Sequence, residues 1–159
     1  MALNQVARDD WQGLLAVAQE SLAAEDPVTA RRAATLAARA APATPEAQLA
    51  LGDVWNALGR HAEAIAHADR ALALNPQYEE AWQIKGLAYG RMGDHERALA
   101  CFVQALRTNP AAAEKARENI RTALRYLGRF EDLKAFERGQ IPLEKLAPPV
   151  PPPSSSKRP

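Results

Sequence analysis

The sequence repeats one pattern of residues every 34 positions, and this period constrains the fold more than any other feature. In the clearest copy, residues 79–110, an amphipathic run, a glycine turn and a second amphipathic run follow one another. Its landmarks are Trp82, Gly86, Tyr89, Gly93, Ala98, Phe102, Ala105, Asn109 and Pro110. The copy 34 residues earlier carries Gly52, Trp55, Gly59, Ala64, Ala68, Ala71, Asn75 and Pro76. This pattern predicts helix–turn–helix units that complete their cores by stacking on one another.

A weaker copy precedes these two, and a diverged one follows them. Ala18, Ala30, Ala34, Ala37 and Pro42 keep the register, although Ser21 and Glu25 stand where Trp55 and Gly59 stand in the next copy. After Pro110 the register slips, because Gly128 lies 35 residues after Gly93. We therefore predict an array over residues 1–138 with repeats at about 11–44, 45–78 and 79–112 and a diverged capping pair at 113–138. A Pro/Ser-rich tail, 139–159, follows.

The run from Trp82 to Pro110 resembles the tetratricopeptide repeat, with Lys85 in place of Leu as its one departure from the pattern. The resemblance covers residues 11–138. It implies an all-α fold, a right-handed superhelix of antiparallel helix pairs. It also implies a protein–protein interaction module that works as an adaptor, scaffold or chaperone, and not an enzyme.

Small residues are expected where the two helices of a pair approach most closely. Gly59 and Gly93 can adopt the left-handed conformation that ends a helix, so each turn can be short. By the family pattern, Gly52 should face Ala64 and Gly86 should face Ala98. A bulky residue at any of these positions should overpack the contact.

Composition excludes several classes of function. The net charge of +1 gives no overall field that would attract nucleic acid or an acidic membrane. Cys101 is the only cysteine, and no signal peptide or membrane span is recognisable, so we expect a cytoplasmic location. No phosphate-binding loop, HExxH motif or nucleophile–base pair is present. We accordingly expect no enzyme activity, no cofactor, no metal, no nucleic acid and no membrane as partner.

In tetratricopeptide arrays the first helix of each repeat lines a concave groove, so the resemblance implies where a partner would bind. The candidate groove residues are Leu49, Asp53, Asn56, Gln83, Leu87, Arg91, Arg117, Arg121 and Arg125. The arginines would make one end basic, while Glu46, Asp53 and Glu80 make the middle acidic. We therefore expect a peptide with an apolar anchor and an acidic flank. The Lys and Asn clamp of co-chaperones that hold acidic chaperone tails is absent.

Two alternatives stay open. The chain could instead be a structural or accessory subunit that self-associates, or docks in a larger assembly, through the convex face or the end caps; we expect a monomer or a weak homo-oligomer. The tail could be a flexible extension, it could pack back through Ile141, Leu143 and Leu146, or its prolines could dock in an aromatic groove of another protein.

Overall fold

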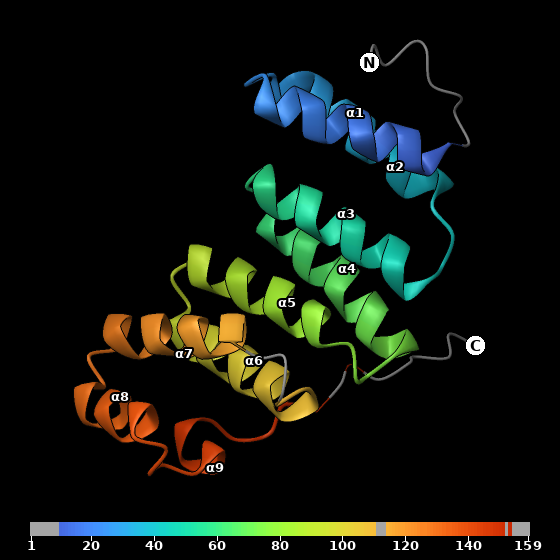
Figure 1. The fold of residues 1–159 in the computed structure, drawn as a ribbon. Helices are drawn as coiled ribbons and strands as arrows, with labels where there is room; N and C mark the ends of the chain where they lie inside the picture. Colours follow the sequence, from blue (N-terminus) through green and yellow to red (C-terminus); the bar gives the residue numbers. More distant parts are fainter. Residues whose placement is uncertain (1–9, 111–113, 152, 154–159) are drawn as a thin grey trace.

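A computed structural model describes residues 10–110, 114–151 and 153. In these ranges the chain forms helices and no strands, and the helices stack as antiparallel pairs into a right-handed superhelix (Figure 1). The helices are α1 (Trp11–Ala23), α2 (Pro27–Ala40), α3 (Pro45–Ala57), α4 (His61–Leu74), α5 (Glu79–Arg91), α6 (His95–Thr108), α7 (Glu114–Tyr126), α8 (Phe130–Glu137) and α9 (Leu143–Leu146). The predicted fold class is therefore confirmed.

Helix starts and turns have local causes. Asp26 and Thr44 each accept a hydrogen bond from a backbone N–H of the helix they precede, and a proline follows each of them as the first helical residue. Gly59 and Gly93 close the α3–α4 and α5–α6 turns at φ 72° and 83°. In the first turn, Glu25 adopts the same left-handed conformation at φ 57°, which costs a residue with a side chain more than it costs glycine.

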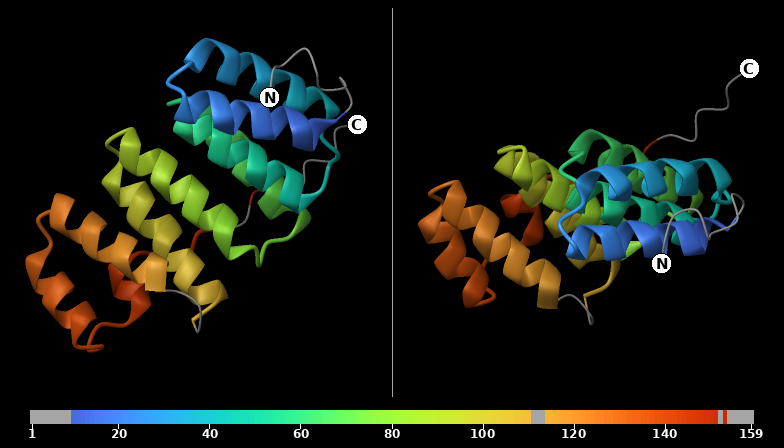
Figure 2. Two further views of the ribbon diagram at one scale, coloured as in Figure 1. Left: turned by 45° about the horizontal axis from the view of Figure 1, so that its top comes forward. Right: turned by 90° about the horizontal axis from the view of Figure 1, so that it is seen from above.

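The core is built mainly from alanine and leucine and runs through the stack in two clusters. One cluster joins α1, α2 and α3 and includes Ala64 of α4 and Ala88 of α5, and the other joins α4 to α9. Ala37, Ala71 and Ala105, one per repeat, are fully buried. The first helices of the pairs, α1, α3, α5 and α7, run along one side with α2, α4 and α6 behind them (Figures 1 and 2).

At one expected close contact the structure adds a side chain that the repeat pattern did not indicate. A methyl group added at Gly86 would lie 2.5 Å from Cε1 of Phe102, and the three nearest atoms all belong to that ring. The glycine therefore makes room for the aromatic ring of Phe102, one helical turn beyond Ala98 on α6, and its expected contact with Ala98 stays a prediction. At Gly52 the nearest group is Ile84 of the next repeat, at 3.2 Å, and the carbonyl oxygen of Ala64 follows at 3.5 Å.

The chain after α8 packs back on the repeats. Leu146 is 2% exposed and belongs to the same core cluster as α6, with Ile141 and Leu143 packed against it. Arg129 donates hydrogen bonds to the carbonyl oxygens of Lys145 and Leu146, and Arg107 of α6 donates one to Ala147. These contacts favour the second of the three interpretations of the tail for residues up to Val150; residues 152 and 154–159 lie outside the described part.

Candidate functional site

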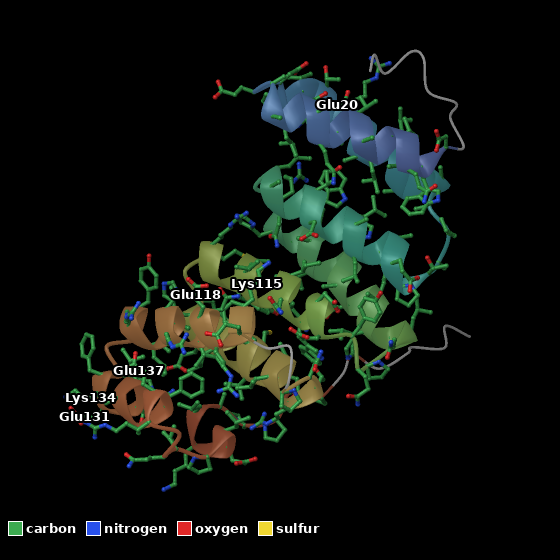
Figure 3. The ribbon with its side chains drawn as sticks, viewed as in Figure 1. Glu20, Lys115, Glu118, Glu131, Lys134 and Glu137 are labelled. Atoms are coloured by element: carbon green, nitrogen blue, oxygen red, sulfur yellow. The ribbon has the colours of Figure 1, made fainter. Side chains whose placement is uncertain are left out.

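A hollow of about 330 Å³ lies where α3, α5 and the start of α7 meet. We call it the acidic hollow, and its wall consists of Asp53, Glu79, Glu80, Gln83, Ile84, Leu87, Asn109 and Lys115. Three carboxylates face one ammonium group, that of Lys115, which is labelled at the start of α7 in Figure 3. Its chemistry therefore suits a ligand that brings positive charge or hydrogen-bond donors.

Two side chains in this wall are held in unusual environments. Gln83 is buried, and its amide nitrogen donates a hydrogen bond to the Glu79 carboxylate. Its Oε1 is also buried and has no hydrogen-bond partner among the described residues. Burial raises the pKa of Asp53, while the charge of Lys115 opposes that rise. A hydrogen-bond donor entering the hollow would give Oε1 of Gln83 a partner and would stabilise the charged form of Asp53.

A second hollow of about 460 Å³ lies between the α5–α6 hairpin and α7. We call it the apolar hollow, and it is lined by Leu87, Gly90, Arg91, Gly93, His95, Ala98, Phe102, Asn119, Thr122, Ala123 and Tyr126. Leu87 belongs to both walls, so the two hollows adjoin along α5. Together they form a groove with an acidic part near the start of α5 and an apolar part near its end.

The apolar hollow lies beside Gly90, at a repeat position where the preceding repeat has asparagine. Asn56 occupies that position in the preceding repeat, where its Nδ2 donates to the Ile84 carbonyl oxygen at 3.0 Å and its Oδ1 lies 3.1 Å from Nδ1 of His61. Gly90 has no such side chain. His95, the counterpart of His61, instead stacks on Tyr126 with ring centroids 4.5 Å apart.

The structure brings some of the predicted groove residues together. Asp53, Gln83 and Leu87 lie in the acidic wall, and Leu87 and Arg91 lie in the apolar wall. Leu49 is half-buried against the core. Asn56 is buried, and its hydrogen bonds run to other parts of the protein.

The three arginines of α7 are placed differently. Arg117, Arg121 and Arg125 lie four residues apart on α7, and none lines either hollow. Arg121 makes an ion pair with Glu114 at 3.2 Å, within the same helix. Their role in binding stays a prediction.

Sequence reasoning missed several wall residues, chiefly Glu79, Lys115, Gly90 and Tyr126. Glu79 and Lys115 fall outside the groove positions of the repeat pattern, so the pattern alone does not indicate them. Gly90 did carry a signal, because it breaks the correspondence with Asn56. Tyr126 could not be placed, since the register slips before the end of α7.

No site for other chemistry stands out in the described part of the chain. No group of three or more His, Cys, Asp or Glu side chains in residues 10–110, 114–151 and 153 is placed to hold a metal ion. Nor does that part contain a helix long and apolar enough to cross a membrane. Burial raises the pKa of the Cys101 thiol to about 12, so this cysteine stays protonated and unreactive at neutral pH.

Stacked helix pairs with a groove along their first helices define a helical-repeat protein, a class of scaffolds that bind other proteins. Two family models, both described as tetratricopeptide repeat, match residues 11–79 and 79–111. The chain belongs to the tetratricopeptide repeat family. Members of this family are typically interaction modules without enzymatic activity.

Solved structures have the same fold at low sequence identity. The crystal structure of MamA matches with a TM-score of 0.66 and 22% identity over 86% of this chain and 74% of that one. The Sgt2 TPR domain from Aspergillus fumigatus matches with a TM-score of 0.62 and 22% identity over 92% of each chain. The first TPR domain of human RPAP3 matches with a TM-score of 0.63 and 20% identity over 79% of this chain and 98% of that one.

Proposed function

We propose that this protein is an adaptor or scaffold that binds a segment of a partner protein in the groove formed by α3, α5 and α7. The observation that carries the proposal is the pair of adjoining hollows along α5, which share Leu87. A groove of this kind can hold an extended or helical peptide, whose side chains would enter the two hollows.

The charges of the groove supply its selectivity. Asp53, Glu79 and Glu80 would attract a basic residue or a free amino group at the acidic hollow. Arg91, together with Arg121 and Arg125 of α7, would attract an acidic flank at the other end, because guanidinium groups bind carboxylates in pairs of hydrogen bonds. Opposite charges at the two ends would fix the direction in which the peptide binds.

The test begins with a pull-down from the native source and identification of the bound protein by mass spectrometry. The partner segment is then titrated against the native chain and against two charge-reversed chains, Asp53→Lys with Glu80→Lys, and Arg121→Glu with Arg125→Glu. Each double variant should weaken binding and change its salt dependence. Glu137→Lys, an exposed position on α8 labelled in Figure 3, is the matched control and should leave binding unchanged. Native affinity in both double variants would move the interface off the groove.

A second candidate function, self-association through the C-terminal end, is favoured by one observation. Tyr126 and Phe130, on either side of the α7–α8 turn, are 70% and 58% exposed. Light scattering tests it, because a self-associating chain would exceed 17.3 kDa in a concentration-dependent way. Tyr126→Ser with Phe130→Ser should abolish that dependence, and a native chain that stays monomeric would remove this candidate.

A further inference from the structure

We propose that the apolar hollow around Gly90 is a pocket for one large apolar or aromatic side chain of the partner, and that an acidic residue follows this side chain and contacts Arg91. The proposal rests on the proposed function, that the groove along α5 binds a peptide. It specifies that the anchor is a large apolar or aromatic side chain, that its neighbour is acidic, and that the anchor enters the apolar hollow.

The walls of the hollow fit such an anchor. Leu87, Ala98, Phe102 and Ala123 supply apolar surface. His95 and Tyr126 lie at one side as a stacked pair, at an interplanar angle of 5°. The volume of about 460 Å³ lies within the usual range of about 300–1,000 Å³ for pockets that hold small molecules. A flat ring or a branched aliphatic side chain entering here would leave water for apolar contact.

The preceding repeat shows that the hollow is not required by the packing of the repeats. There Asn56 fills the corresponding position and joins α3 to α5 and to His61 through hydrogen bonds. A Cβ atom added at Gly90 would meet nothing closer than Ala98, at 3.8 Å. Helix packing would therefore tolerate a larger residue at this position, and glycine leaves the space open.

Polar groups around the hollow define what accompanies the anchor. The amide nitrogen of Asn119 is buried in the wall and has no hydrogen-bond partner among the described residues. A peptide carbonyl group beside the anchor would give it an acceptor. Among the described residues that line this hollow, Arg91 carries a permanent positive charge and none is a carboxylate. Charge complementarity therefore selects an acidic residue next to the anchor.

The experiment uses three synthetic tetrapeptides, blocked at both ends, and the full chain labelled with ¹⁵N. The first probe is Gly-Phe-Glu-Gly, the second has Lys in place of Glu, and the third has Ala in place of Phe. Titration of the first should shift the backbone amide signal of Gly90 and the side-chain amide signal of Asn119. The second and third should each bind at least about tenfold more weakly, since one loses a charge pair and the other a buried aromatic side chain.

The decisive variant is Gly90→Asn, which installs the residue of the preceding repeat. It should fill the hollow and weaken binding of the first probe by at least about tenfold. Its melting temperature should not fall, because the added Cβ makes only an ordinary contact and glycine is a poor helix former. Ala62→Asn, an exposed position on α4, is the matched control and should bind as the native chain does.

These experiments test the anchor pocket independently of the proposal that the groove binds a partner protein. Undiminished binding to Gly90→Asn, or equal binding of the Glu and Lys probes, would overturn the assignment of the anchor pocket. Absence of shifts at Gly90 and Asn119 with millimolar probe would overturn it as well. In these cases the groove as a whole could still bind its partner, because the charge-reversed chains test that point with the native partner segment.

Discussion

The second and third repeats have the same backbone fold but different side chains at equivalent buried positions. In the second repeat, Oε1 of Gln48 lies 2.9 Å from Nδ1 of His67 inside the helix pair. The corresponding residues of the third repeat are Trp82 and Cys101, both buried, and Trp82 donates a hydrogen bond to the Pro76 carbonyl oxygen at 3.3 Å. One repeat therefore has a hydrogen-bonded polar pair where the other has an aromatic ring and a thiol.

The same contrast appears at the close contact and at the groove. Ala68 in the second repeat corresponds to Phe102 in the third, whose ring fills the space left by Gly86. Asn56 corresponds to Gly90, beside the apolar hollow. The third repeat thus places its bulk inside the helix pair and leaves space at its edge. This comparison shows how one scaffold can acquire a binding pocket without any change of fold.

The largest effect should come from the Phe102 ring. Phe102→Ala should cost about 3–5 kcal/mol of unfolding free energy, because it leaves a cavity against Gly86. Gly86→Ala alone should cost about 1–3 kcal/mol through overpacking, but almost nothing when Phe102 is already Ala. Urea unfolding of the two single variants and the double variant measures this coupling. Simple additivity would mean that the two residues do not meet.

Gly52→Ala, at a contact of 3.2 Å with a single Ile84 methyl group, should cost less than Gly86→Ala.

The polar pair of the second repeat should make stability depend on pH. Burial lowers the pKa of His67 to about 4, with a smaller contribution from the charge of Arg70. The unfolded chain binds this proton near pH 6.5, whereas the folded chain does not until about pH 4, so stability is complete above pH 6.5 and falls as the pH is lowered toward 4. The loss attributable to His67 should reach about 3 kcal/mol.

Unfolding of the native chain and of His67→Gln between pH 4 and 7 measures that loss. The variant keeps a hydrogen-bonding side chain but cannot titrate, so its stability should change less with pH. Identical pH profiles would show that His67 is not held neutral in the fold. Cys101, its counterpart in the third repeat, should contribute nothing here, since its raised pKa keeps it neutral throughout.

The third repeat also packs against the segment after α8. Leu146→Ala should cost about 2–3 kcal/mol, because this side chain is buried against α6. Hydrogen exchange should then quicken in α6 and α7 more than in α3 and α4. Ending the chain at Arg138 should have at least the same effect. A melting temperature unchanged by both would favour a flexible extension instead.

Turn geometry should produce the smallest effect. The second and third repeats both turn through a glycine, whereas the first turns through Glu25 at positive φ. Glu25→Gly should therefore stabilise the protein by about 1 kcal/mol, and Gly93→Ala should destabilise it by a similar amount. Thermal unfolding measures both. A loss of stability in Glu25→Gly would show that the side chain of Glu25 contributes more than its backbone conformation costs.

The fold could be predicted from the sequence because a 34-residue period fixes both the elements and their order. Side-chain contacts were harder to predict from the sequence. The register alone aligns Gly86 with Ala98, but the larger side chain of Phe102 reaches the glycine from the next turn of α6. The acidic groove residues Asp53 and Glu80 were predicted, because repeat positions locate them. The apolar hollow was not, since it depends on where Tyr126 lies after the register has slipped.

Site-specific photo-crosslinking tests the central claim, that the partner lies in the groove along α5. A p-benzoylphenylalanine residue is introduced separately at Glu80, at Arg91 and, as a control, at Val28, an exposed position on α2. With the purified partner, irradiation should produce crosslinks from positions 80 and 91 and none from position 28. Crosslinks from position 28 alone would place the interface on the first repeat and contradict the account.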